Sequence, residues 1–109
     1  MARRKPVLTV ILAPQAENEL DEIYRWNLEQ RNVGAADAYI AFLKSKIKGL
    51  AAGYDQGKPV EGRPDLLYLL MKKRMSGDGH IAVYSVFDTE AIVEVLHIFH
   101  TKHNWENKL

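Results

Sequence analysis

The residue types best suited to chemistry gather in the last third of the chain. Imidazoles titrate near neutral pH and can act as acids or bases, and a cluster of cationic side chains can contact phosphate. The residues concerned are four histidines, a basic run and one tyrosine: His80, His97, His100, His103, 72–74 and Tyr84. These types could serve proton transfer, phosphate binding or metal binding.

A metal site is the first of these to test, because His97, His100 and His103 recur at three-residue intervals. That interval places side chains on one face of a helix, but this segment has the composition of a strand, in which residues three apart point to opposite faces. No cysteine and no cluster of carboxylates completes a ligand set. We expect no metal and no cofactor.

The basic run ends in Arg74, which could contact phosphate or could be an ordinary surface arginine at the end of a strand. If 66–74 is a strand, Lys72 and Arg74 point to one side and Lys73 to the other. At most two of the three cations can therefore converge on one ligand.

His80 opens the next extended run, and Tyr84 follows on the same face of that strand. His80 could transfer protons, but without an identified partner it could equally be an exposed or turn-packed histidine. Tyr84 could stack on a ligand, although a tyrosine in a central strand usually belongs to the core.

The elements that position these residues can be predicted from periodicity and from breakers. The apolar run 7–12 predicts a strand, Pro14 opens a helix, 32–34 ends it, and 35–50 predicts a second, antiparallel helix. Glycines and prolines crowd 53–65 and predict a loop. The runs 66–74, 80–87 and 91–100 predict an antiparallel meander, with the middle of the sheet covered on both faces.

Composition and charge limit the class of protein. The 109 residues are 47% hydrophobic, which predicts one domain over residues 1–109, with 1–6 flexible. The absence of cysteine, of a secretion signal and of a membrane-length apolar run favours the cytoplasm. The net charge is +1, with opposite charges segregated along the chain, so we expect no sequence-specific DNA binding by this chain alone.

We therefore expect an α+β fold in which a two-helix hairpin packs on a mainly antiparallel four-stranded sheet, in the order strand-helix-helix-strand-strand-strand. Several features of the chain occur together in one known family: this order of elements, Ala16, Arg74 before a Gly-rich turn, and the segments 19–23, 80–84 and 92–100. By these features the chain resembles the RelE/ParE toxins of type II toxin–antitoxin systems. The resemblance covers roughly 7–105 and is closest to the ParE-like branch.

The resemblance implies one of two activities, either ribosome-dependent cleavage of mRNA or inhibition of DNA gyrase. RNA-cleaving relatives follow the histidine matched by His100 with basic residues and a tyrosine, whereas this chain has Trp105 near that place. Indole cannot transfer a proton near neutral pH. The ending favours a gyrase inhibitor and predicts no catalytic residues. In the alternative, Trp105 stacks on a base and the endoribonuclease uses these residues: Arg74, His80, His100 and His103.

The resemblance also implies a ParD-like antitoxin in a heterotetramer or larger complex, a role in plasmid stabilisation, and no membrane partner. Trp26 lies off the main apolar stripe of the first helix, between polar neighbours, and is predicted to be an exposed anchor. The predicted partner-binding residues are Trp26, Arg74, His80, Lys102 and Trp105. A third possibility is an inactive module that survives as half of a repressor complex.

Overall fold

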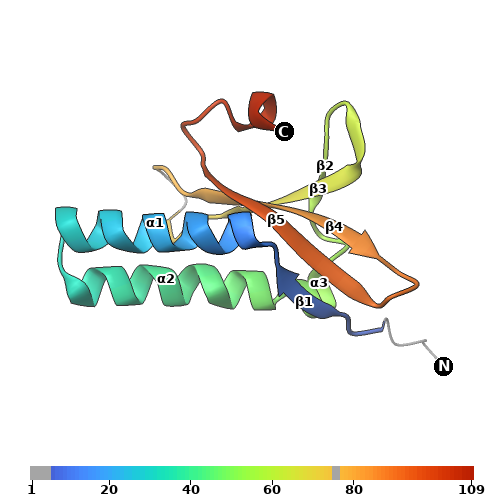
Figure 1. The fold of residues 1–109 in the computed structure, drawn as a ribbon, viewed down its shortest axis with the longest axis horizontal. Coiled ribbons are helices and arrows are strands. Elements are labelled where there is room, and N and C mark those ends of the chain that lie inside the picture. The colour runs from blue at the N-terminus through green and yellow to red at the C-terminus, as the bar shows by residue number, and fades with distance from the viewer. Residues whose placement is uncertain (1–5, 75–76) are drawn as a thin grey trace.

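A computed structural model describes residues 6–74 and 77–109, and shows two long helices beside a twisted sheet (Figure 1). Residues 1–6 were predicted to be flexible, and of these all but Pro6 lie outside the described residues. The elements in chain order are β1 (Thr9–Leu12), α1 (Pro14–Gln30), α2 (Val33–Lys48), α3 (Leu50–Gly53), β2 (Lys58–Val60), β3 (Arg63–Met71), β4 (His80–Phe87), β5 (Ile92–His100) and the 3-10 helix η1 (Trp105–Lys108).

The sheet has five strands in the order β1-β5-β4-β3-β2 and is mixed. The α+β class and the helix hairpin are confirmed, but the prediction of four mainly antiparallel strands is wrong in two details. First, β1 pairs in parallel with β5, with Thr9 opposite Ile92. The helices return the chain to the far side of the sheet, and the meander then brings β5 alongside β1 in the same direction.

The second detail is β2, which lies inside the segment predicted to be a loop. It pairs antiparallel with β3, and Gly62 forms the turn with a φ of 77°. Proline lacks a backbone donor, yet Pro59 is tolerated because β2 is an edge strand. The breakers at 53–65 therefore mark the irregularities of a hairpin and of the short helix α3, not a continuous loop.

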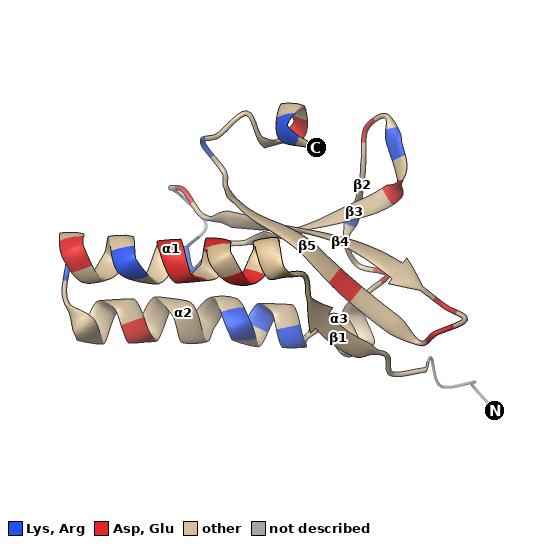
Figure 2. Cartoon of the chain, in the orientation of Figure 1, with Lys and Arg blue, Asp and Glu red and all other residues tan. Residues whose placement is uncertain are grey.

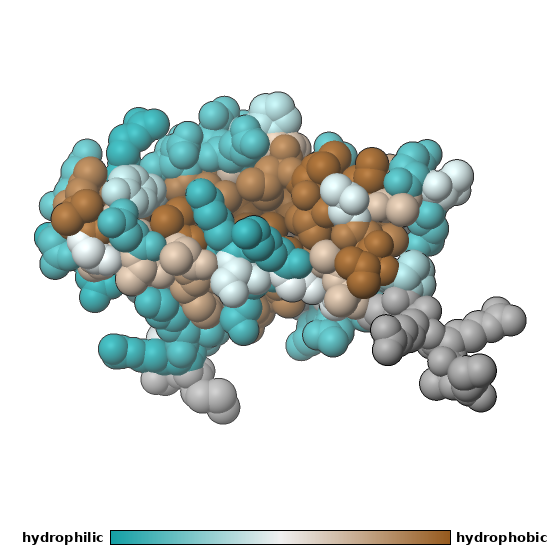
Figure 3. Space-filling view, turned by 90° about the horizontal axis from the view of Figure 1, so that it is seen from below, coloured by the Kyte–Doolittle hydropathy of each residue, from teal (hydrophilic) through white to brown (hydrophobic). Residues whose placement is uncertain are grey.

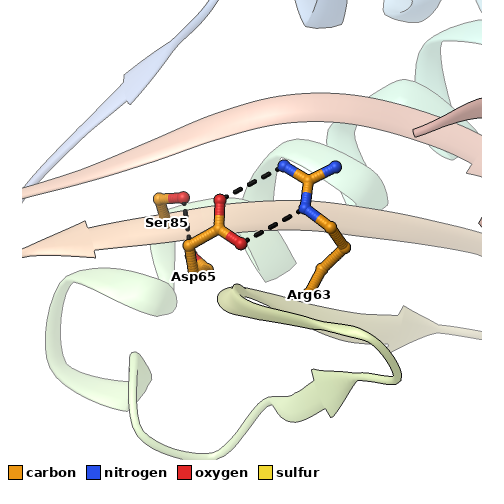
Figure 4. A network of polar contacts seen from close by, with 3 residues as sticks. All are labelled: Arg63, Asp65 and Ser85. Carbon is orange, nitrogen blue, oxygen red and sulfur yellow. Dashed lines mark hydrogen bonds and ion pairs between the residues drawn. The ribbon is translucent and has the colours of Figure 1, made fainter.

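The strand β3 begins and ends earlier than the predicted 66–74. Near its start, the carbonyl of Asp65 accepts a hydrogen bond from the buried Ser85 hydroxyl of β4, at 2.9 Å (Figure 4). The Asp65 carboxylate pairs with the exposed Arg63 at 3.2 Å, which lowers the pKa of this carboxyl. Because β3 ends at Met71, residues 72–74 lie beyond it, and the predicted alternation of their side chains does not apply.

The two long helices meet at Asn32, which was predicted to terminate the first of them. Its side chain accepts a hydrogen bond from the backbone N–H of Ala35 at 2.8 Å, so Asn32 is the N-cap of α2. The following Val33 and Gly34 already belong to α2. Asparagine suits both ends of a helix, and here the N-cap role prevails.

Each face of the sheet has its own core, as predicted for its middle. The helices cover one face over a large cluster that includes Leu43, Val95 and the fully buried Tyr84, whose hydroxyl donates to the Tyr54 carbonyl at 2.8 Å. On the other face a smaller cluster lies under η1, and its members are Val60, Leu66, Ile81, Val83, Phe99 and Trp105. A register shift after Val83 places one extra residue, Leu96, in β5.

Apolar side chains also remain on the surface. Patches of them gather on the face that carries α2 and β1 (Figure 3). Among the exposed apolar residues of these two elements, Val33 of α2 is 58% and Ile11 of β1 is 40% exposed. Such patches are typical of surfaces that bind other proteins. Among the described residues, every helix is too short or too polar to cross a bilayer.

Candidate functional site

A cleft of about 1060 Å³ lies between α1, the end of β5 and the C-terminal segment. Its walls contain most of the residues that the sequence singled out. From the predicted set, the cleft is lined by Trp26, His80, His100, Lys102 and His103; His97, which was considered only as a metal ligand, also lines it. Residues separated by more than seventy positions therefore meet in one hollow.

Three of the imidazoles form a row along one side of the cleft. The ring centroids of His80 and His100 lie 5.1 Å apart, edge to face, and those of His100 and His103 lie 5.6 Å apart. The first pair arises because His80 and His100 face each other across β4 and β5. The tail then turns back and adds His103. Among the described residues no group of histidines, cysteines or carboxylates is placed to hold a metal ion.

The partner that the sequence could not identify for His80 is Tyr39 of α2. Its hydroxyl lies 2.5 Å from Nδ1 of His80. Burial and the neighbouring His100 and His103 lower the pKa of His80 to about 4, and burial raises the pKa of Tyr39. Both side chains are therefore neutral at pH 7, and they share a neutral hydrogen bond.

The turn between β3 and β4 holds this row in place. Gly79 donates its N–H to the Thr101 hydroxyl at 3.0 Å and accepts the Thr101 N–H at 3.0 Å. A Cβ at Gly79 would lie 2.5 Å from the Met71 carbonyl, so the chain passes too closely for any side chain. Glycine at this position lets the chain enter β4 directly beside the end of β3.

The tail fixes the tautomer of His100. The backbone N–H of Lys102 donates to Nδ1 of His100 at 3.1 Å, so the proton of the neutral ring is on Nε2. The Lys102 ammonium is 3.1 Å from the Asp78 carboxylate, which is an exposed pair of small energetic value. A backbone hydrogen bond from the tail thus orients the His100 ring.

Two to three residues before His100, α1 reaches β5 through Glu19. One carboxylate oxygen accepts the backbone N–H of Ile98 at 2.8 Å, and the other lies 3.5 Å from Nδ1 of His97. The second distance permits an ion pair, but the geometry is not that of a hydrogen bond, and the buried Nδ1 makes none within the described residues. Glu19 was noticed in the sequence only as part of a motif, because its partners are far away along the chain.

Two predicted site residues lie elsewhere. Arg74 is exposed beyond the end of β3 and does not line the cleft. Trp105 is only 6% exposed, because its ring packs against Tyr68 and Phe99 on the face of the sheet opposite the helices. Its ring centroid lies 5.1 Å from that of Tyr68 and 6.4 Å from that of Phe99. A partner could contact this indole only after the C-terminal segment moved. Trp26, by contrast, is 60% exposed, as predicted.

Comparison with known proteins places these features in a family. A family model described as the ParE toxin of the type II toxin–antitoxin system parDE matches residues 10–105. No curated protein sequence matches the chain.

Several solved structures share the fold. A chain of the chromosomal ParDE system from P. aeruginosa is 16% identical, with a TM-score of 0.74, and the match covers 88% of this chain and 98% of that one. The free E. coli toxin RelE, in mutant form, is 16% identical, with a TM-score of 0.59 and coverages of 94% and 92%. A chain of the RelBE2 complex from Mycobacterium tuberculosis is 17% identical, with a TM-score of 0.56, and the match covers 86% of this chain and 98% of that one.

Proposed function

Because the chain belongs to the ParE toxin family of type II toxin–antitoxin systems, we propose that it inhibits DNA gyrase and that a ParD-like antitoxin neutralises it. The observation that carries this proposal is the match to the ParE model, which runs from β1 to Trp105. A domain that acts by holding another protein needs no acid–base pair of its own.

The chemistry of the cleft supports an inhibitor. Cleavage of RNA through its 2′-hydroxyl needs cations for the charged phosphorane and groups that exchange protons. Of the two cations that the sequence singled out, the Arg74 guanidinium lies outside the cleft and the Lys102 ammonium is paired with Asp78; Arg31 and Lys108 are the other cations of the lining. With a pKa of about 4, His80 carries no charge at pH 7.

Gyrase assays test the proposal directly. Purified toxin, freed of antitoxin, is expected to stop supercoiling and to trap gyrase on cleaved DNA in proportion to the toxin added. The same toxin premixed with its antitoxin provides the control. Normal gyrase turnover at saturating toxin would remove the proposal.

The row of histidines favours a second candidate, a ribosome-dependent endoribonuclease. Here His100 or His103 would exchange protons, Tyr39 would orient His80, and Arg74 would contact phosphate from outside the cleft. This candidate predicts mRNA cleavage on translating ribosomes that is lost in His100→Gln and Arg74→Ala. Intact transcripts after induction, together with DNA breaks, would decide for gyrase.

The proposal extends to the cell. We expect a cytoplasmic toxin in a heterotetramer or larger complex with its antitoxin, and a contribution to plasmid stabilisation where the genes lie on a plasmid. Among the predicted contacts, Trp26, His80 and Lys102 line the cleft and are the ones placed to meet a partner without rearrangement. Normal growth during expression without antitoxin would indicate an inactive module.

A further inference from the structure

Four exposed lysines that the proposed function leaves unused gather around α2. Three of them, Lys44, Lys46 and Lys48, lie in the second half of that helix, and Lys73 follows the end of β3. None of the four lines the cleft, and none belongs to an ion pair among residues 6–74 and 77–109. These four side chains form the lysine surface of the molecule.

The lysine surface flanks α2 on both sides. At about 3.6 residues per turn, Lys44 and Lys48 fall on one flank of the helix and Lys46 falls on the other. On the second flank, the Lys46 and Lys73 ammonium groups lie 5.9 and 5.7 Å from the centroid of the Phe42 ring. The crest between the flanks carries small exposed side chains, which are those of Ala38, Ala41 and Ser45.

The charge of this region is opposite to that of α1. The segments 38–48 and 66–74 contain basic side chains but no acidic one, and Figure 2 shows acidic segments along α1 and basic ones in the second half of α2. The helix dipole favours Lys46 and Lys48 in the last turn of α2, but it does not account for Lys44 or Lys73. A concentration of one charge on one side of a protein favours a polyanionic partner.

We propose that the lysine surface contacts the phosphate backbone of duplex DNA, namely the duplex that gyrase holds while the toxin is bound to the enzyme. This inference rests on the proposed function, because an inhibitor that traps gyrase on cleaved DNA acts beside such a duplex. The major groove is about 12 Å wide and admits an α-helix, so cations on the two flanks of α2 can reach phosphates of both strands.

The crest of α2 makes this contact independent of DNA sequence. Contacts to phosphate position a protein on the duplex but carry no sequence information, which is read from the edges of the bases. The side chains of Ala38 and Ala41 offer no hydrogen-bonding group to a base, and Ser45 offers one hydroxyl. The proposal therefore agrees with the expectation that this chain alone does not bind DNA sequence-specifically.

Two other kinds of partner fit the lysine surface less well. Proteins that hold unpaired nucleic acid strands stack the bases on aromatic rings. The Phe42 ring is already packed against Tyr39, with ring centroids 6.0 Å apart, and two ammonium groups approach it. Interfaces between proteins are depleted in lysine, and the crest side chains are too small to serve as anchors. Duplex DNA is the polyanion that needs neither stacking rings nor anchors.

The first experiment measures DNA binding by the full chain, freed of antitoxin, with two fluorescent duplexes of about 30 base pairs and unrelated sequence. Anisotropy should give dissociation constants within about twofold of each other. The logarithm of the association constant should fall against the logarithm of salt concentration with a slope of about −3.6, or about −0.9 for each lysine. A slope near zero, tighter binding of single-stranded DNA, or displacement of the duplex by polyglutamate at equal charge would overturn the proposal.

A matched set of variants assigns this slope to the lysine surface. The double variant Lys46→Gln with Lys73→Gln should make the slope shallower by about two units, whereas Lys46→Arg with Lys73→Arg should keep it. Lys58→Gln is the control, because Lys58 pairs with Tyr68 and therefore points to the face of the sheet opposite the helices. The same slope in the double glutamine variant and in the control would contradict the proposal.

The other flank of α2 provides an independent pair. Lys44→Gln with Lys48→Gln should also make the slope shallower by about two units. Thermal unfolding shows which variants fold, and this pair replaces the first if the first does not. An effect of one flank without the other, in folded variants, would overturn the placement of the duplex across α2.

Gyrase assays separate this inference from the proposed function. At low salt, Lys46→Gln with Lys73→Gln is expected to need at least about tenfold more toxin than the parent to trap gyrase on cleaved DNA, while it binds DNA-free gyrase equally well. Equal trapping by the two proteins, or weaker binding of the variant to DNA-free gyrase, would overturn the inference and leave gyrase inhibition standing. Duplex binding by a chain that leaves gyrase active would reject the proposed function, and the contact with the DNA backbone would remain.

Discussion

The two faces of the central sheet are covered in different ways. On the helix face, α1 and α2 bring a dozen buried residues together, and the histidine row sits at the rim of that cluster. On the other face, the smaller cluster is covered by a 3-10 helix of four residues, which contributes one indole, that of Trp105. The large core can include a row of polar side chains at its margin. The small core is closed by one side chain, so its stability depends on that side chain.

The largest effect should come from removing that side chain. Trp105→Ala exposes Phe99 and Tyr68 and is expected to lower the free energy of unfolding by about 3 kcal/mol. Urea denaturation followed by circular dichroism measures the change. A loss below about 1 kcal/mol would mean that the second face is not closed by this indole.

The histidine row should make the helix face sensitive to pH. In the unfolded chain His80 takes up a proton below about pH 6.5, but in the folded protein its pKa is about 4. Between these values the unfolded state binds more protons, so stability falls as the pH is lowered. We expect a loss of about 2 kcal/mol, after allowing for partial exposure of the ring.

The variant His80→Gln isolates this contribution from the carboxylates that titrate in the same range. Its free energy of unfolding, measured by urea titration between pH 7 and pH 4, should depend less on pH than that of the parent protein. Parallel pH profiles for the two proteins would show that His80 is not held neutral by burial.

A smaller effect is expected from a buried hydroxyl within the helix-face core. Tyr84→Phe removes a part-buried hydrogen bond to the Tyr54 carbonyl, at a cost of about 1 kcal/mol. Tyr24→Phe, whose hydroxyl donates to Asp37 at the surface, provides the matched control. If chemical denaturation gives the two variants the same stability, the Tyr84 hydroxyl contributes nothing beyond its ring.

The smallest change in stability should come from the other tryptophan. Trp26→Ala is expected to alter the free energy of unfolding by no more than about 0.5 kcal/mol, since the side chain is 60% exposed. Its affinity for the antitoxin, measured by calorimetry, should fall at least about tenfold. An unchanged affinity would remove Trp26 from the predicted interface.

Much of the architecture could be predicted because it depends on local signals. Pro14 and the apolar stripe define α1, and the runs 80–87 and 91–100 match β4 and β5 within one residue. The parallel pairing of β1 and the edge strand β2 could not be predicted, because both depend on which strand lies alongside. Pro59 resembles a breaker until its strand is known to be at an edge.

The site was less predictable than the fold. The sequence identified His80 and His100 but not Tyr39, which lies 41 positions before His80 in the run predicted to be the second helix. It also placed Arg74 in a strand that ends at Met71. Such contacts arise from the packing of a helix on a sheet, and no spacing within one element encodes them.

The order in which the chain is synthesised gives the position of β5 a further consequence. This strand is the last of the five to leave a ribosome, yet it lies between β1 and β4 and pairs with both. Until it emerges, β1 has no strand to pair with, and closing so long a loop is slow. The nascent chain therefore cannot complete its sheet before residues 92–100 have been synthesised.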